Sequence, residues 1–210
     1  MQKNPTPEEV KNQQIRDRQQ SVFERRFVGS SLSEIRSPEW VQVKINQFLK
    51  KKSGFLIYCS NPGTGKTYTC SALTEWAMDN FGSSWRYWKE GEIYQKLRSL
   101  MDSSSGDYMD NLKYLIDDDL LIIDDLGSAK KLNDWREEVL FSIIDYRYNS
   151  QKPTIITSNF FEKEFFDNYH SRIHSRLFSD ENIVIQWKQS VDFRLEQKTN
   201  AEYKHEIPLF

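Results

Sequence analysis

Short apolar or aromatic runs alternate with longer amphipathic stretches through the middle of the chain. The runs have the length and composition of buried strands and lie at residues 55–59, 85–88, 120–123, 154–157 and 183–185. The stretches between them repeat their apolar residues every three or four positions, which is typical of helices, and one such helix is expected to run from Lys66 to about Asn80. This alternation predicts an α/β fold in which helices sandwich a parallel five-stranded sheet.

The two ends of the chain have a different pattern. Thr6-Pro7-Glu8-Glu9 predicts a helix start, because Thr6 can cap the helix and Glu9 occupies the capping-box position. The helix expected from there to about residue 26 is mostly polar, so it is either solvated or docks on a partner. We therefore expect an N-terminal helical extension with a possible partner-docking role, a core domain and a polar tail, at residues 1–34, 35–195 and 196–210.

Residues 54–67 read Gly-Phe-Leu-Ile-Tyr-Cys-Ser-Asn-Pro-Gly-Thr-Gly-Lys-Thr. A strand, a glycine-rich turn and a helix in this order form the pattern of a phosphate loop, with Ser60 in place of its first glycine. The glycines let successive backbone N–H groups point at phosphate oxygens. Lys66 can reach the β- and γ-phosphates, and the Thr67 hydroxyl can bind Mg²⁺. A chance strand–turn–helix is the alternative, and the surrounding pattern argues against it.

Asp124 and Asp125 follow the most apolar of the expected strands. Open α/β sheets bind ligands at the carboxyl ends of their strands. There Asp124 could hold Mg²⁺ opposite Thr67, and Asp125 could orient or deprotonate an attacking water. A polar strand cap explains the two aspartates taken alone. Their combination with a phosphate loop favours nucleotide binding.

Three further residues are candidates for catalysis. Asn159 ends the fourth strand, where an amide could position water near a γ-phosphate, although turns also favour asparagine. Arg172 and Arg176 are four residues apart and therefore share one helix face. One of them could stabilise charge on a neighbouring subunit's γ-phosphate. The alternative is an ordinary surface helix with salt bridges.

Composition narrows the class of protein further. The 210 residues carry a net charge of −2, which excludes a strongly basic nucleic-acid coat protein but not a local basic groove. No apolar run approaches the roughly 20 residues that cross a bilayer, so we expect no membrane association. The start of the chain has no apolar signal region. Cys59 and Cys70 are expected to be reduced core residues of a cytoplasmic protein.

Taken in order, four motifs resemble those of the AAA+ ATPases, most closely the DnaC/DnaI helicase loaders of the IstB/DnaC-like family. They are Pro62-Gly63-Thr64-Gly65-Lys66-Thr67, Leu121-Ile122-Ile123-Asp124-Asp125-Leu126-Gly127, Pro153-Thr154-Ile155-Ile156-Thr157-Ser158-Asn159 and Arg172-Ile173-His174-Ser175-Arg176-Leu177. The resemblance covers about residues 35–195.

The resemblance implies ATP and Mg²⁺ as cofactors and assigns a role to each matching residue. Asp124 and Asp125 are the Walker B pair, Asn159 is sensor 1, and Arg176 or else Arg172 is the arginine finger. Arg194 matches sensor 2 loosely. The nucleotide-binding residues implied are Asn61, Pro62, Gly63, Thr64, Gly65, Lys66, Thr67, Tyr68 and Arg194, and the implied metal-binding residues are Thr67 and Asp124.

The sequence departs from the family pattern in ways that carry expectations. Asp125 stands where many members have glutamate, and its shorter side chain predicts slow ATP hydrolysis. The segment before the core is short, so the usual helicase-binding domain would be either reduced or replaced by the helix at residues 7–26. The family orders its strands 5-1-4-3-2, which is the order expected here. Few residues follow the core, so little or no C-terminal lid is expected.

The function implied first is an ATP-dependent switch that loads a replicative hexameric helicase onto single-stranded DNA and assembles through its arginine finger. Candidate DNA contacts are the basic and aromatic residues Lys96, Arg98, Lys113, Tyr94 and Tyr108. The alternatives are an IstB-type ATPase that assists a transposase on duplex DNA, a small-molecule P-loop kinase, and an adaptor that binds ATP but barely hydrolyses it.

Overall fold

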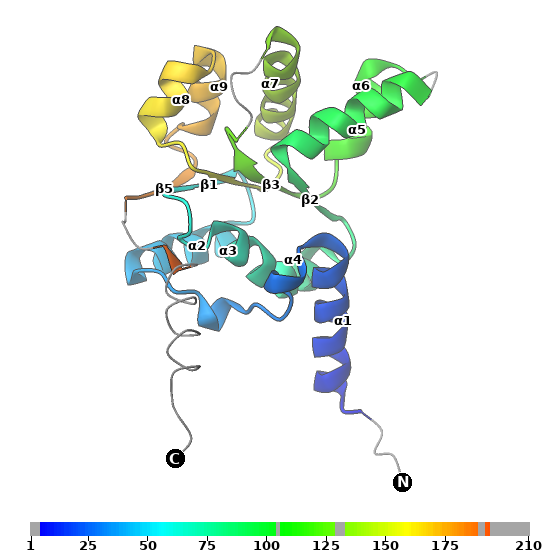
Figure 1. Cartoon of the computed structure of the whole chain (residues 1–210), viewed down its shortest axis with the longest axis vertical. Helices are drawn as coiled ribbons and strands as arrows, with labels where there is room; N and C mark the ends of the chain where they lie inside the picture. Colours follow the sequence, from blue (N-terminus) through cyan, green and yellow to red (C-terminus); the bar gives the residue numbers. More distant parts are fainter. Residues whose placement is uncertain (1–4, 104–105, 129–132, 189–191, 194–210) are drawn as a thin grey trace, which may run out of the picture.

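The computed structural model describes residues 5–103, 106–128, 133–188 and 192–193. Arg194 and the tail, residues 196–210, lie outside the described residues. The described chain forms one parallel sheet in the order β2-β3-β4-β1-β5, which confirms the expected 5-1-4-3-2 arrangement (Figure 1). The strands are β1 Phe55–Ser60, β2 Trp85–Lys89, β3 Leu120–Leu126, β4 Thr154–Ser158 and β5 Ile183–Trp187.

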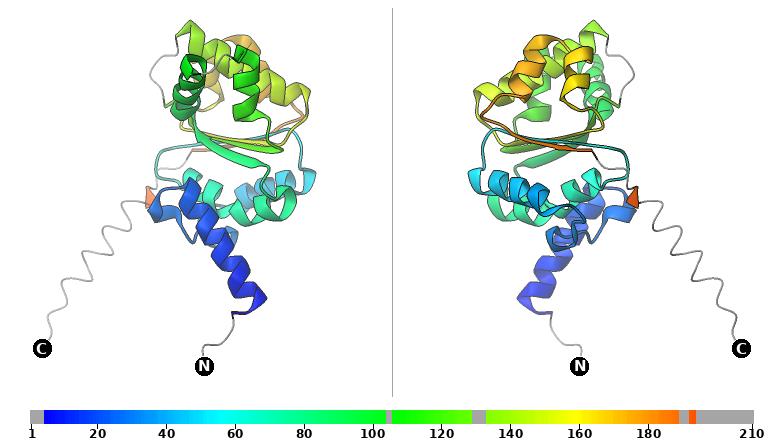
Figure 2. Two further views of the ribbon diagram at one scale, coloured as in Figure 1. Left: turned by 90° about the vertical axis from the view of Figure 1, so that its right-hand side faces the viewer. Right: turned by 90° about the vertical axis from the view of Figure 1, so that its left-hand side faces the viewer.

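Helices cover both faces of this sheet, as predicted (Figures 1 and 2). One face carries the N-terminal helices α1 Pro7–Val22, α2 Glu39–Lys51, α3 Lys66–Ala72 and α4 Thr74–Phe81 with the short 3-10 turns at Arg25–Phe27 and Leu32–Glu34. The other face carries α5 Glu90–Ser103, α6 Tyr108–Ile116, α7 Asp134–Asn149, α8 Glu162–Asn168 and α9 Ser171–Leu177. The predicted α/β sandwich is therefore present.

Alternation along the central strands divides the apolar side chains between two cores. On β1, Leu56 and Tyr58 pack with α2, α3 and α4, whereas Phe55, Ile57 and Cys59 pack on the opposite side. All six residues of β1 are buried, because helices lie over both faces. The sheet is thus a rigid platform whose strand ends can present polar residues.

One expected helix is divided in the structure. A single helix from Lys66 to about Asn80 was predicted, but the chain turns at Leu73, where ψ is −5°, and α4 follows α3. Leu73 is fully buried, and its N–H lies within reach of the carbonyl oxygens of both Ser71 and Thr69. The prediction of one continuous helix was wrong in this respect.

The N-terminal helix is partly docked on the domain. Thr6 caps α1 through the predicted capping box, with Thr6 Oγ1 accepting from the Glu9 N–H at 3.2 Å. Towards its end Ile15 and Gln19 are buried, while the first two turns are exposed. The sequence left solvation and partner docking open, and in the structure the second half of the helix packs on its own chain. Within the described ranges no helix has the length and apolar character needed to cross a membrane.

Candidate functional site

The loop between β1 and α3 has the geometry of a phosphate cradle. Gly63 and Gly65 have φ values of 81° and 91°, in the left-handed region where a side chain causes strain. A Cβ added to Gly63 would lie 2.0 Å from an Asp192 carboxylate oxygen, so a side chain here would also have to displace that of Asp192. Gly65 is followed directly by Lys66, the first residue of α3. The loop therefore delivers its backbone to the start of a helix, where anions are stabilised.

Ser60, which replaces the first glycine of the motif, is accommodated inside the loop. Its hydroxyl is fully buried and shares a hydrogen bond with Thr64 Oγ1 at 2.5 Å. Thr64 Oγ1 also lies 2.9 Å from the Asn61 carbonyl oxygen. The serine thus replaces the flexibility of glycine with an internal polar contact and leaves the turn intact.

Lys66 reaches back across this loop. Its ammonium donates to the carbonyl oxygens of Ser60 at 2.8 Å and Asn61 at 2.9 Å, and to Asn159 Oδ1 at 2.8 Å. All three acceptors are neutral oxygens, and ionised phosphate oxygens form stronger hydrogen bonds with ammonium groups. The lysine is therefore placed where an anionic ligand would bind better than these three oxygens.

Thr67 and Asp124, predicted as the metal-binding pair, are in contact. Thr67 Oγ1 donates to Asp124 Oδ2 at 2.8 Å, and the carboxylate is almost completely buried. The Tyr87 hydroxyl donates to the same oxygen at 2.8 Å, and the Thr157 hydroxyl donates to Asp124 Oδ1. A hydroxyl beside a carboxylate is a donor set that suits Mg²⁺ when phosphate oxygens complete it. The residues present thus fit a magnesium–nucleotide complex.

Asp125 and Asn159 extend the same network. The register between β3 and β4 shifts after Ile123, and Asp125 has a φ of 59°, which aspartate tolerates better than most residues. Asn159 Nδ2 donates to Asp125 Oδ1 at 2.9 Å while its Oδ1 accepts from Lys66. Asp125 is therefore linked to Lys66 through one amide group. A strained backbone angle such as the positive φ of Asp125 is common at functional sites.

Burial controls the protonation of the neighbouring side chains. Burial, and after it the negative charge of Asp124, raises the pKa of Tyr87 far above its usual range, so its hydroxyl remains a donor. Burial also raises the pKa of the Cys59 thiol to about 12 and that of Cys70 well above its ordinary value. Both cysteines are buried and unpaired with each other, as expected for reduced core residues.

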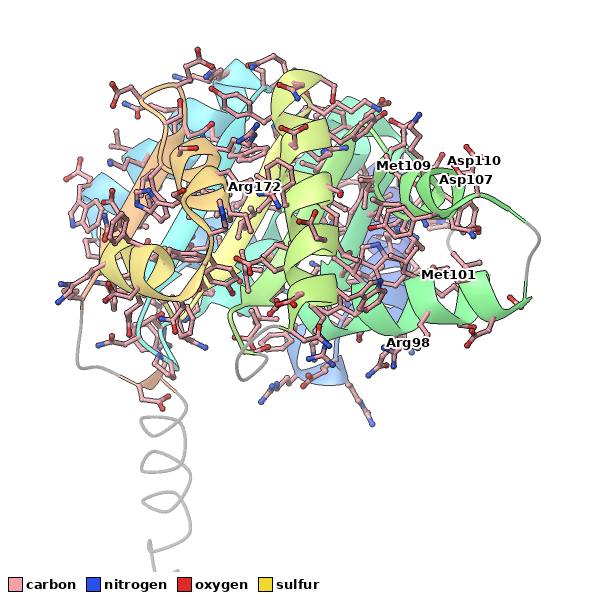
Figure 3. The ribbon with its side chains drawn as sticks, turned by 90° about the horizontal axis from the view of Figure 1, so that it is seen from above. Arg98, Met101, Asp107, Met109, Asp110 and Arg172 are labelled. Atoms are coloured by element: carbon pink, nitrogen blue, oxygen red, sulfur yellow. The ribbon has the colours of Figure 1, made fainter. Side chains whose placement is uncertain are left out.

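The two candidate arginines lie apart from this network. Arg172 pairs with Glu138 and stacks 3.9 Å over the Phe141 ring, and Arg176 Nε donates to Asp145 Oδ1 at 2.7 Å. Figure 3 shows Arg172 beside α7, which carries both acidic partners. Among the described residues, these arginines contact α7 and α9 and not the phosphate loop. Their side chains are 38% and 27% exposed, so both remain accessible from outside.

The structure corrects one predicted DNA contact and reveals two site residues that the sequence did not indicate. Tyr94 cannot stack on a base, because it is 4% exposed and its hydroxyl donates to the buried Glu90 at 3.0 Å. Tyr87 and Thr157 both donate to Asp124, yet each looks like an ordinary strand residue. Only the register of β3 against its two neighbours could have identified them.

Comparison with known proteins places this geometry in a family. Residues 25–183 match the model of the IstB-like ATP binding protein family. No curated protein matches the chain. Among solved structures, DnaI is 23% identical with a TM-score of 0.60, covering 84% of this chain and 100% of DnaI. The DnaC helicase loader is 24% identical with a TM-score of 0.62, covering 78% of this chain and 100% of the loader.

A third similar structure is the replication initiator DnaA bound to AMPPCP and single-stranded DNA. It is 18% identical with a TM-score of 0.64, and the match covers 86% of this chain and 56% of that one. Identities at this level establish a shared fold. The family match spans more than half of the chain, and the predicted resemblance to the IstB/DnaC group is thereby confirmed. This protein belongs to the IstB-like ATP-binding protein family.

Proposed function

We propose that the protein is a cytoplasmic ATP-dependent switch that loads a replicative hexameric helicase onto single-stranded DNA. The observation that carries the proposal is the convergence of Lys66, Thr67 and Asp124 at the carboxyl end of the sheet. The similarity in fold to DnaI and to the DnaC helicase loader supports loading as the purpose of the switch.

Each part of the site has a proposed role in nucleotide binding. The loop N–H groups and Lys66 would hold the phosphates, and Thr67 and Asp124 would hold Mg²⁺. ATP with Mg²⁺ supplies a phosphoanhydride bond that water can break. Asn159 would release Lys66 and turn its amide towards the attacking water. That amide already contacts both Lys66 and Asp125. Asp125 would orient that water. Hydrolysis would be slow because the Asp125 side chain is short and already accepts a hydrogen bond from Asn159.

Hydrolysis would also require a second copy of the chain. We assign Arg176, or else Arg172, the role of an arginine finger for a neighbouring site. For this role Arg176 must exchange Asp145 for a phosphate of the neighbour, and a part-exposed ion pair is weak enough for that exchange. Arg176→Ala should leave ATP binding unchanged and abolish the rise in hydrolysis rate with protein concentration. Retention of that rise would contradict the assignment.

The loading function is tested with purified hexameric helicase. Wild-type protein should co-elute with the helicase in the presence of ATP, whereas Lys66→Ala should not. Val10 lies on the first part of α1 and is 42% exposed, so a substitution there tests whether this segment docks on the helicase. Val10→Glu should weaken helicase binding and leave ATP binding intact. Wild-type protein that binds ATP but ignores both helicase and single-stranded DNA would contradict the loading function.

The second candidate is an ATPase that assists a transposase on duplex DNA. It is favoured by the family model itself, which is that of IstB-like proteins. ATP-dependent assembly on duplex DNA without helicase binding would select this function over loading. Phosphoryl transfer from ATP to a nucleoside monophosphate would instead indicate a small-molecule kinase.

A further inference from the structure

Tyr87 connects the N-terminal part of the chain to the carboxylate that we assign to Mg²⁺. It lies on β2 opposite Ile122 of β3, two residues before Asp124. Its hydroxyl donates to Asp124 Oδ2 at 2.8 Å, the oxygen that also accepts from Thr67. The position of the tyrosine ring therefore bears directly on the orientation of this carboxylate.

Phe23 holds the other side of the same ring. It follows the last residue of α1 and is 7% exposed. Its ring centroid lies 4.4 Å from that of Tyr87 at an interplanar angle of 54°, a favourable aromatic contact. The next residue, Glu24, pairs with Lys89 at 2.8 Å on the same strand. The end of α1 is thus held against β2 at Tyr87 itself and two residues beyond it.

Gln19 fixes the helix on which this contact depends. The side chain is fully buried, and its Nε2 donates to the carbonyl oxygens of Ser30 and Ser71 at 3.0 Å each. Its Oε1 accepts from the Gly29 N–H at 2.7 Å. Ser71 belongs to α3, the helix that begins with Lys66. The N-terminal segment therefore contacts both the strand and the helix that flank the proposed metal site.

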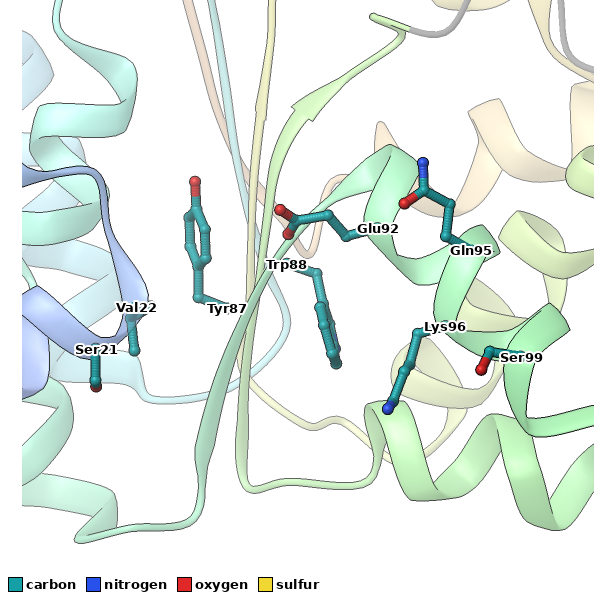
Figure 4. A pocket seen from close by; sticks show the side chains of 8 residues that line it. All are labelled: Ser21, Val22, Tyr87, Trp88, Glu92, Gln95, Lys96 and Ser99. Carbon is teal, nitrogen blue, oxygen red and sulfur yellow. The ribbon is translucent and has the colours of Figure 1, made fainter. Parts of the chain in front are cut away.

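Open space lies beside this junction. A cleft of about 490 Å³ separates the last turn of α1 from α5, and Figure 4 shows Tyr87 on the α1 side of β2 and Trp88 on the α5 side. Its walls are formed by Ser21, Val22, Glu92, Gln95, Lys96 and Ser99. Because one side of α1 is open here, the helix end can shift without a collision with α5.

We propose that Tyr87 is a positioning residue for the magnesium-binding carboxylate and that the seating of residues 15–23 against β2 sets the Mg²⁺ affinity of the site. This inference rests on the proposed ATP-binding function and adds a route by which a partner on α1 could regulate it. Groups that orient metal ligands by hydrogen bonding are commonly worth 10- to 100-fold in metal affinity. A partner that displaces the exposed start of α1 would weaken the contact between Phe23 and Tyr87. This change would in turn weaken the hydrogen bond from Tyr87 to Asp124.

The first test removes only the hydroxyl. In Tyr87→Phe the affinity for ATP without Mg²⁺ should be unchanged, while the concentration of Mg²⁺ that half-saturates ATP binding should rise about 10-fold. Tyr58→Phe is the matched control, because Tyr58 is buried in the same core and its hydroxyl has no hydrogen-bond partner among the described residues. The control should not change the Mg²⁺ requirement.

The second test acts at the N-terminal side. Phe23→Ala should raise the half-saturating Mg²⁺ concentration about threefold, and Phe23→Leu should restore much of the loss because it fills the contact again. Thermal unfolding without nucleotide, measured in parallel, reports the cost in stability separately. An unchanged Mg²⁺ requirement in Tyr87→Phe, or in Phe23→Ala, would overturn the inference while ATP binding by the wild type stands. Failure of the wild type to bind ATP would overturn the proposed function itself.

Discussion

The carboxyl ends and the amino ends of the strands form two edges of the sheet. Among the described residues a buried cation lies at each of these edges, and the two are held differently. Lys66, at the carboxyl ends of the strands, is attached by a single ammonium to a glycine-rich loop and to Asn159. Arg147, at the opposite edge, uses its whole guanidinium group, and its acceptors are Thr154 Oγ1 and the carbonyl oxygens of Ile116, Asp118, Asp119 and Pro153. Arg147 is fully buried, and burial lowers its pKa to about 10, still well above neutral pH.

The contrast separates stability from function. The acceptors of Arg147 lie where the chain enters β3 and β4, so the arginine joins the starts of two strands in a fixed arrangement. The three acceptors given above for Lys66 can be exchanged for a ligand because they are neutral and lie on the loop or at a strand end. A substitution of Lys66 is therefore expected to weaken ligand binding and leave the fold stable. A substitution of Arg147 is expected to destabilise the fold.

The largest effect should follow from Arg147→Met. The variant leaves several buried carbonyl groups without donors, and each buried polar group left unsatisfied costs ~1–3 kcal/mol. Chemical denaturation should show this loss in the free energy of unfolding. A loss below ~1 kcal/mol would indicate that the starts of β3 and β4 do not depend on the arginine.

Lys66→Ala should have the complementary result. We expect the dissociation constant for ATP to rise ~100-fold, equivalent to about 2.7 kcal/mol, because the variant removes the cation that we propose faces the phosphates. Lys152→Ala is the matched control at the opposite edge, where Lys152 pairs with Asp117. Isothermal titration calorimetry should find normal ATP affinity in that control. Equal losses in both variants would remove the distinction between the two edges.

Ser60→Gly should have a smaller effect. It restores the usual glycine of the motif but removes the buried hydrogen bond to Thr64, which is worth ~0.5–1.5 kcal/mol of stability. The ATP affinity should remain within about threefold of wild type, since the backbone path does not depend on the hydroxyl. Unfolding and titration experiments on the same sample measure the two quantities. A large loss of affinity would show that the serine itself contacts nucleotide.

The smallest effect concerns acid stability at the Arg147 edge. Hydrogen bonds from Lys152, and then from Tyr146, lower the pKa of Asp117 from its ordinary value of 3.8. A carboxyl group whose pKa is lowered by folding stabilises the fold at pH values above its pKa in the unfolded chain. This contribution disappears as the pH falls through its pKa in the folded protein. Asp117→Asn should therefore cost ~0.2–1 kcal/mol at pH 7 and nothing once the carboxyl is protonated. A difference that persists at low pH would mean that the carboxyl charge is not its cause.

The phosphate loop, Asp124, Asn159 and the strand order could be predicted because each follows from a local pattern or from family resemblance. Tyr87 and Arg147 could not be, since their roles depend on strand register and on where distant turns place their carbonyl groups. Gln19 is a similar case, because a glutamine on a polar helix gives no sign of burial. Tyr94 was wrongly expected at the surface because aromatic residues serve equally in cores and on stacking surfaces.

The central claim is that Asp124 holds magnesium together with bound ATP, and calorimetric titration of ATP with and without Mg²⁺ tests it most directly. Wild-type protein should bind ATP at least 10-fold more tightly when Mg²⁺ is present. Asp124→Asn, which preserves the shape of the side chain, should retain the Mg²⁺-free affinity and lose this gain. If the variant gained as much affinity from Mg²⁺ as the wild type, Asp124 would not be a metal-binding residue and the proposed site would be wrong.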